Sequence, residues 1–168
     1  AGTCAVMGTA STMSAIAEAL GMTLPGTAAI PAVHADRLRA AEATGAAAVR
    51  LVRTRLTPDQ VMTELSIENA VRVLLALGGS TNGVIHLAAI AGRLGLKLDL
   101  RRLNELSDTT PVLANVKPVG TEFYMEDLFA AGGIGAVMRE LKPLLHLDCR
   151  SVTGETLGVS GGMGIGAA

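Results

Sequence analysis

The glycine pair Gly78-Gly79 divides the most apolar part of this 168-residue chain into two predicted helices. Before the pair, apolar residues recur with the 3.6-residue period of an amphipathic helix: Ile67, Ala70, Val71, Leu74 and Leu75. After it, residues 83–94 are apolar on nearly every face, which predicts a central, buried helix. A membrane-spanning helix needs about 20 uninterrupted apolar residues. Because the glycines interrupt the stretch, we expect a buried helix pair and no membrane partner.

Helix signals also dominate the rest of the chain. Gly21 is expected to end a first helix over 13–21. The run Thr57-Pro58-Asp59-Gln60 combines an N-cap hydroxyl, a first-turn proline and a capping-box glutamine. Further helices are expected over 36–54 (one or two, interrupted near Gly45), 101–106, 125–129 and 135–145, and short extended segments at 28–33, 112–116 and 151–153. The predicted fold class is mainly α-helical with a few short strands.

Composition restricts the core and the partners. Hydrophobic residues make up 49% of the chain but aromatic residues only 2%, so one domain with a core of Ala, Leu, Val, Ile and Met is expected. The net charge of −1 offers no electrostatic attraction for nucleic acid or for an anionic membrane surface. Two distant cysteines do not suggest a disulfide framework, so we expect a reducing, cytoplasmic compartment.

Cys4 is the first candidate functional residue. It lies in a loop with Gly8, which allows a tight backbone, just before a helix expected to begin near Met13. Three small hydroxyl residues, Thr9, Ser11 and Thr12, offer caps for that helix. The positive end of a helix dipole favours the thiolate, which is the form that binds metal. The alternative is a buried cysteine that acts as a small hydrophobic side chain.

The loop after Gly79 is the second candidate site. Two glycines let a ligand approach the backbone, and Ser80, Thr81 and Asn82 precede a helix N-terminus that suits a carboxylate or another anion. The alternative is an interhelical turn whose hydroxyl groups cap the helix. His34, His86 and His146 show no metal-ligand spacing, and His86 is expected to be a hydrogen-bonded core residue. Nothing around Cys149 suggests a ligand.

Several motifs resemble one enzyme family. The run Cys4-Ala5-Val6-Met7-Gly8-Thr9-Ala10-Ser11-Thr12-Met13 resembles the segment that carries the third iron–sulfur cysteine of the dihydroxy-acid and sugar-acid dehydratases. That family includes dihydroxy-acid, phosphogluconate and arabinonate/xylonate dehydratases. Similar stretches follow in the same order at 19–26, 68–70 leading to 76–82, and 131–134 followed by 152–157. The resemblance implies that residues 1–158 belong to the cluster-bearing N-terminal domain, which is α/β in the family, and that 159–168 form a glycine-rich tail outside the family pattern.

The resemblance also implies a reaction. Members remove water from a 2,3-dihydroxy acid to give a 2-keto acid, using an iron–sulfur cluster (2Fe-2S or 4Fe-4S) and Mg²⁺. Cys4 would be one of three cluster ligands, and Ser80, Thr81 and Asn82 would lie in the cluster-bearing domain as substrate-binding candidates. The family's catalytic base is a serine beyond this chain, so no catalytic residue is assigned here.

We therefore expect an internal piece of a larger hydro-lyase, inactive by itself, whose full-length parent is a homo-oligomer acting on a small hydroxy acid. The Met7–Met13 wording is somewhat closer to the sugar-acid members than to the branched-chain biosynthetic ones. The alternative from a different functional class is a non-catalytic helical module with a buried structural cysteine.

Overall fold

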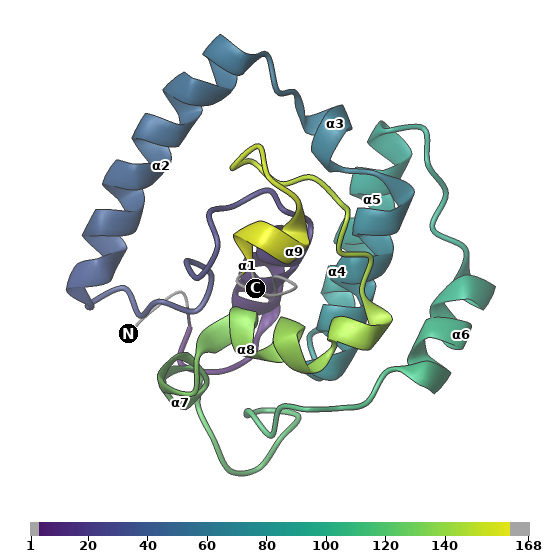
Figure 1. Cartoon of the computed structure of the whole chain (residues 1–168). Helices are drawn as coiled ribbons and strands as arrows, with labels where there is room; N and C mark the ends of the chain where they lie inside the picture. The colour runs from purple at the N-terminus through teal and green to yellow at the C-terminus, as the bar shows by residue number, and fades with distance from the viewer. Residues whose placement is uncertain (1–3, 162–168) are drawn as a thin grey trace.

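A computed structural model describes residues 4–161, and it is built almost entirely from helices (Figure 1). In chain order these are α1 (Thr9–Ala19), α2 (Ala35–Thr54), α3 (Pro58–Val61), α4 (Glu64–Ala76), α5 (Thr81–Arg93), α6 (Leu100–Thr109), α7 (Met125–Ala130), α8 (Gly133–Glu140), the 3-10 helix η1 (Lys142–Leu144) and α9 (Leu157–Ser160). The mainly α-helical fold class is confirmed. No helix of the described part of the chain has the length and apolarity needed to cross a bilayer.

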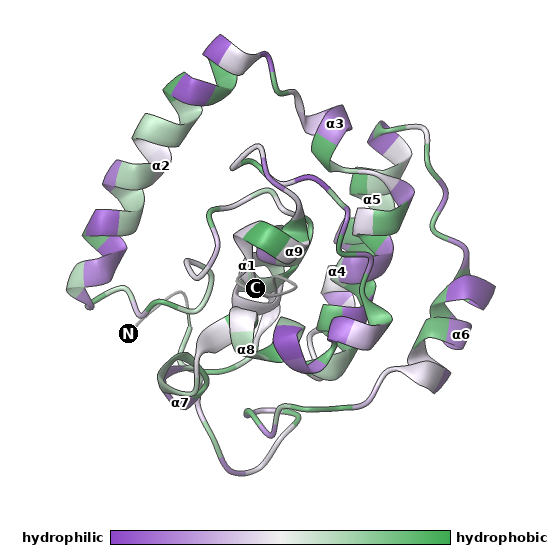
Figure 2. Ribbon diagram, viewed as in Figure 1, coloured by the Kyte–Doolittle hydropathy of each residue, from purple (hydrophilic) through white to green (hydrophobic). Residues whose placement is uncertain are grey.

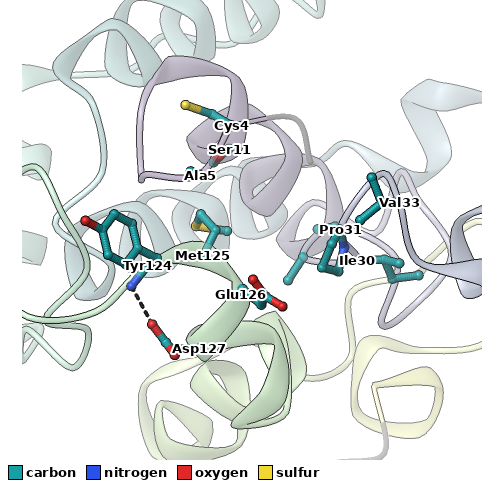
Figure 3. A pocket seen from close by; sticks show the side chains of 12 residues that line it. Cys4, Ala5, Ser11, Ile30, Pro31, Val33, Tyr124, Met125, Glu126 and Asp127 are labelled. Carbon is teal, nitrogen blue, oxygen red and sulfur yellow. Dashed lines mark hydrogen bonds between the residues drawn. The ribbon is translucent and has the colours of Figure 1, made fainter. Parts of the chain in front are cut away.

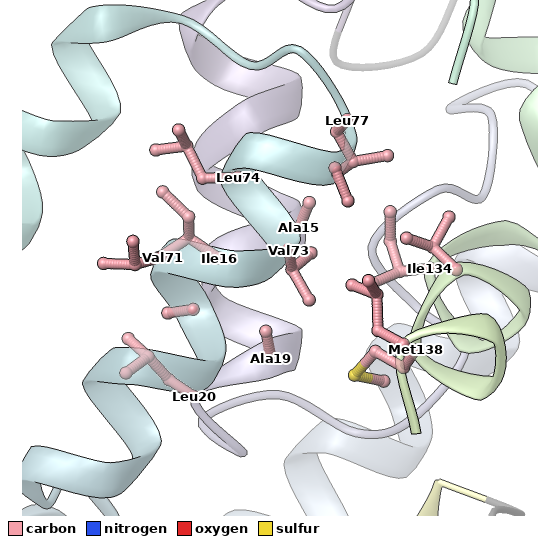
Figure 4. Close-up of a cluster of buried hydrophobic side chains, with 14 of the residues drawn as sticks. Ala15, Ile16, Ala19, Leu20, Val71, Val73, Leu74, Leu77, Ile134 and Met138 are labelled. Atoms are coloured by element: carbon pink, nitrogen blue, oxygen red, sulfur yellow. The ribbon is translucent and has the colours of Figure 1, made fainter. Parts of the chain in front are cut away.

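The core forms where α1 and α8 pack against α4 (Figure 4). The predicted apolar stripe of α4 is buried at Ile67, Ala70, Val71 and Leu74, whereas Leu75 is only partly buried. From α1 come Ala15, Ile16, Ala19 and Leu20, and from α8 come Ile134 and Met138. These side chains are aliphatic or sulfur-containing, as the composition predicts. Full burial of each large one contributes about 1.5–3 kcal/mol.

Helix α1 begins earlier than predicted. Its first residue is Thr9 and its N-cap is Gly8, because the amide of Thr12 already bonds the carbonyl oxygen of Gly8 at 2.9 Å. The hydroxyl groups of Ser11 and Thr12 therefore lie inside the helix and bond other segments instead of capping it. The predicted stop is confirmed: Gly21 has φ +78°, and a Cβ there would lie 2.9 Å from the carbonyl oxygen of Arg150.

Helix α2 continues without interruption, so the break predicted near Gly45 is wrong. Alanines surround that glycine, and their high helix propensity keeps the hydrogen-bond ladder intact. Ala47 is its one buried residue, and apolar and polar positions alternate along its length (Figure 2). At its base the ring of His34 meets Phe129 of α7 edge to face, with centroids 5.4 Å apart.

Helix α5 is not central, contrary to the prediction. Its buried residues are Gly83, Leu87 and Ala91, on one face against α1 and α4. Ile85 is 66% exposed and His86 is also exposed, so His86 is not a core residue. The apolar residues on its outer face do not show by themselves whether another segment packs against them. Within the described residues, neighbouring helices cover one side of α5 only.

The three predicted extended segments do not form strands. The described residues contain two isolated bridges, Val116 with Phe123 and Arg150 with Thr156. Residues 28–33 run through turns, because no other described segment pairs with their backbone and side chains bind these backbone groups instead. The predicted helix start at Thr57 is confirmed, since the side chain of Gln60 accepts a hydrogen bond from the amide of Thr57 at 3.0 Å.

Candidate functional site

The loop that carries Cys4 is fixed between α1 and the segment before α7. The carbonyl oxygen of Ala5 accepts a hydrogen bond from the amide of Met125 at 2.9 Å, and the amide of Met7 donates one to the carbonyl oxygen of Lys117 at 2.7 Å. The hydroxyl of Ser11 donates back to the carbonyl of Val6 at 3.0 Å. These bonds hold a short irregular segment in one place, and they leave the Cys4 side chain half-buried.

Cys4 lines a cavity of about 290 Å³. Cys4, Ala5 and Ser11 form one side of it, residues 28–31 and Val33 form an aliphatic wall, and Tyr124, Met125, Glu126 and Asp127 form the side opposite the thiol (Figure 3). This volume lies near the lower end of the range of about 300–1,000 Å³ that is usual for small-molecule sites. Three segments far apart in the sequence thus line one cavity.

The side opposite Cys4 is polar. The carboxylate of Asp127 accepts a hydrogen bond from the amide of Tyr124 at 2.8 Å and so caps α7, while Glu126 is exposed in the cavity (Figure 3). The ammonium of Lys117 lies 3.0 Å from the hydroxyl oxygen of Tyr124 and 4.3 Å from its ring centre. These four residues were not identified from the sequence: Lys117, Tyr124, Glu126 and Asp127. The capping pattern at the start of α7 could have found Asp127, but only tertiary structure brings it to Cys4.

The donor set was tested against an iron–sulfur cluster. Cys4 is a half-buried cysteine that lines a cavity, which fits one ligand of a cluster. The second thiol, Cys149, lines a different cavity together with Thr63 and His146. Burial raises the pKa of the Cys149 thiol, which disfavours the thiolate form that metals bind. Within residues 4–161, no three His, Cys, Asp or Glu side chains group closely enough to hold a metal ion. Cys4 therefore fits the role of one ligand among several.

The loop of Ser80, Thr81 and Asn82 lies outside this cavity, against the first turn of α1. Ser80 is the N-cap of α5 and accepts from the amide of Asn82 at 3.3 Å. The hydroxyl of Thr9 lies 3.0 Å from that of Ser80 and accepts from the side-chain amide of Asn82 at 3.0 Å. Ser80 and Asn82 thus make the interhelical contacts of a turn, and Thr81 is exposed. Their role in substrate binding stays a prediction.

Close packing explains one glycine of this loop. A Cβ on Gly79 would lie 2.9 Å from Cγ2 of Thr12 and 3.2 Å from the carbonyl oxygen of Leu74. The approach also lets the amide of Ser80 donate to the hydroxyl of Thr12 at 3.0 Å. The two candidate loops found in the sequence are therefore joined through α1, which follows the first and supports the second.

Comparison with known proteins agrees with the motif. The family described as dihydroxy-acid/6-phosphogluconate dehydratase, N-terminal, matches residues 1–160. This chain belongs to that family. It is 48% identical over 159 residues to a dihydroxy-acid dehydratase of Caldicellulosiruptor saccharolyticus, covering 94% of this chain and 29% of the relative. It is 46% identical over 159 residues to one of Caldanaerobacter subterraneus (94% and 28%) and 48% identical over 158 residues to one of Methanococcoides burtonii (94% and 28%).

The chain spans less than a third of the length of these curated dehydratase relatives. The family match extends to residue 160, so it takes in the first residues of the predicted tail at 159–168. Residues 159–160 end α9, and residues 162–168 lie outside the described part of the chain.

Proposed function

We propose that this chain forms part of the cluster-bearing N-terminal domain of a hydro-lyase that converts a 2,3-dihydroxy acid into a 2-keto acid. One observation carries the proposal: Cys4, the cysteine of the matching motif, lines a cavity in a chain that is 48% identical to a dihydroxy-acid dehydratase.

In this proposal the Cys4 thiolate holds one iron of a 2Fe-2S or 4Fe-4S cluster together with cysteines outside this chain. When bound, such a cluster with Mg²⁺ supplies Lewis-acid assistance to loss of the hydroxyl group. The chain's own residues shape the surroundings. Ala29 and Ile30 form an aliphatic wall that excludes water, and the ammonium of Lys117 offers a positive charge beside Tyr124.

For the substrate we propose a 2,3-dihydroxy acid, supported by the names of the relatives. A sugar acid such as arabinonate or xylonate is the second candidate, supported by the wording of the Cys4 motif. Ser80, Thr81 and Asn82 are proposed to contact the substrate carboxylate, with the exposed hydroxyl of Thr81 as the free donor. Activity of the full-length enzyme on a branched-chain dihydroxy acid and on arabinonate would separate the two classes.

The decisive experiment compares the two cysteines in a full-length dehydratase that contains this chain. Cys4→Ser should abolish the visible absorbance of the cluster and the activity together, because a neutral hydroxyl of similar size binds iron poorly. Cys149→Ser should leave both nearly intact, since its thiol lines another cavity. Loss of the cluster in Cys149→Ser but not in Cys4→Ser would overturn the assignment. Full iron content in both variants would favour the non-catalytic alternative for Cys4.

A further inference from the structure

The aliphatic wall of the Cys4 cavity is an irregular loop held by a buried acid. Glu18, at the end of α1, is only 2% exposed. One of its carboxylate oxygens accepts from the amide of Gly26 and the other from the amide of Ala28, each at 2.8 Å. Burial of a carboxylate costs free energy unless its oxygens are hydrogen-bonded, and here both oxygens accept from backbone N–H groups.

A basic side chain binds the same loop through the carbonyl groups of the loop. Arg37, in the first turn of α2, donates to the carbonyl oxygen of Thr27 at 3.2 Å and also to that of Ile30. Within residues 26–30, Glu18 accepts hydrogen bonds from two backbone N–H groups, and Arg37 donates hydrogen bonds to two backbone C=O groups. Backbone groups that would otherwise need a neighbouring strand are satisfied by two side chains of opposite charge.

This loop links the thiol side of the cavity to the opposite side. Residues 28–31 line the cavity with Cys4. The Cβ of Ala29 lies so close to the start of α8 that a Cβ added to Gly133 would meet it at 3.3 Å. Helix α8 follows α7 directly, and α7 carries Tyr124, Glu126 and Asp127 into the cavity. A displacement of the loop would therefore change the cavity on both sides.

We propose that Glu18 and Arg37 are positioning residues, a two-sided clamp on residues 26–30 that sets the wall of the cavity relative to Cys4. The clamp itself stands on the contacts above, and its consequence for the substrate rests on the proposed function. In the full-length enzyme, loosening the wall should raise KM more than it lowers kcat, because neither clamp residue lines the cavity.

The chain carries its own reporters for a test that needs no cluster. Tyr124 is its single tyrosine, tryptophan is absent, and so its fluorescence comes from the cavity. In a Cys149→Ser background, the alkylation rate of the remaining thiol reports on Cys4 alone. Both are measured in the 168-residue chain, together with the urea midpoint of unfolding.

The variants are Glu18→Gln and Arg37→Gln, each with a matched control. A glutamine at position 18 keeps the size but turns one acceptor into a donor that faces a backbone N–H group. Asn69→Ala is its control, because Asn69 is also buried and also holds a loop by two hydrogen bonds, to the backbone of His146 at 2.8 and 2.9 Å, away from the cavity. Arg39→Gln is the control for Arg37, since Arg39 lies on the same helix and pairs only with Asp36.

Loss of one loop anchor should raise the Cys4 alkylation rate by up to roughly fivefold, the factor expected for a local opening equilibrium that loses one hydrogen bond. The quenching of Tyr124 by acrylamide should rise by less, because this side chain is already 44% exposed. Asn69→Ala should lower the urea midpoint without changing either reporter. The clamp is overturned if Glu18→Gln and Asn69→Ala move the reporters equally, or if Arg37→Gln behaves like Arg39→Gln. Arg37→Gln decides the matter even where Glu18→Gln does not fold. If the clamp variants change both reporters but the full-length enzyme lacks a cluster, the proposed function fails and the clamp stands.

Discussion

Substitution of two glycines in α5 separates close packing from helix propensity. Gly83 lies in the first turn, and a Cβ there would lie 2.8 Å from Cδ1 of Leu74, 3.0 Å from Cγ2 of Thr12 and 3.1 Å from Cδ1 of Ile16. Gly92 lies in the last turn of the same helix, and a Cβ there would meet nothing within 4 Å. Gly83→Ala and Gly92→Ala therefore add the same methyl group to opposite surroundings.

The expected free energies follow from two opposing effects. Alanine is favoured over glycine in a helix by up to about 1 kcal/mol, and this gain is similar at both positions. An extra methyl group in a packed core costs about 1–3 kcal/mol. Gly92→Ala should thus raise the free energy of unfolding by up to about 1 kcal/mol. Gly83→Ala should be less stable than Gly92→Ala by about 1–3 kcal/mol, since only it meets the overpacking cost.

Urea unfolding followed by far-UV circular dichroism measures both variants. For a chain of this size, 1 kcal/mol corresponds to about 2–4 °C in Tm, so thermal unfolding gives an independent check. Equal stabilisation by the two substitutions would refute the reasoning. It would mean that α5 does not approach α1 and α4 as closely as in the structure, and Gly83 would need another explanation.

Three further outcomes follow from charges and ligands. The hydrogen bond from Arg102 lowers the pKa of Glu68, whose carboxylate also lies 3.0 Å from Nε2 of His146. The stability that ionised Glu68 contributes should be present above about pH 4.5 and be lost as pH falls through the lowered pKa. Glu68→Gln should remove this loss of stability at acid pH in urea titrations. Burial raises the pKa of Glu18, so its contribution should be complete below about pH 4.5 and decrease as pH rises through the raised pKa, and Glu18→Gln should abolish that slope. With Cys4 as its single candidate ligand, the 168-residue chain should hold no stable cluster, and stoichiometric iron and sulfide in the monomer would contradict this.

The helices were largely predictable because their signals are local. The apolar period of α4, the glycine stop of α1 and the capping pattern at Thr57 each depend on residues within one or two turns. The position of α5 was not predictable in this way. Its sequence is apolar around the helix, and only its neighbours decide which face is covered. The false strand at 28–33 has the same cause, since a strand requires a partner that the sequence cannot show.

The same distinction between local and tertiary signals applies to the candidate site. Cys4 and its glycine-bounded loop were found from the sequence, because the chemistry lies in a short motif. Glu126 and Asp127 were not, since about 120 residues separate them from Cys4, with which they line one cavity. The polar residues after Gly79 were found, but the structure shows that Ser80 and Asn82 bond Thr9 of α1.

Helix α1 organises the whole site. Cys4 precedes it, Thr9 and Thr12 in its first turns bind the loop of Ser80, and Glu18 at its far end holds the cavity wall. Ile16, fully buried between these functions, joins the helix to the core. Its truncation to alanine would cost about 2–5 kcal/mol, a large share of the 5–15 kcal/mol that stabilises a typical domain. Variants at the buried positions of α1 therefore affect stability as well as site geometry. Assigning a role to one of its residues requires a buried control residue elsewhere, such as Asn69, with the urea midpoints of both variants measured side by side.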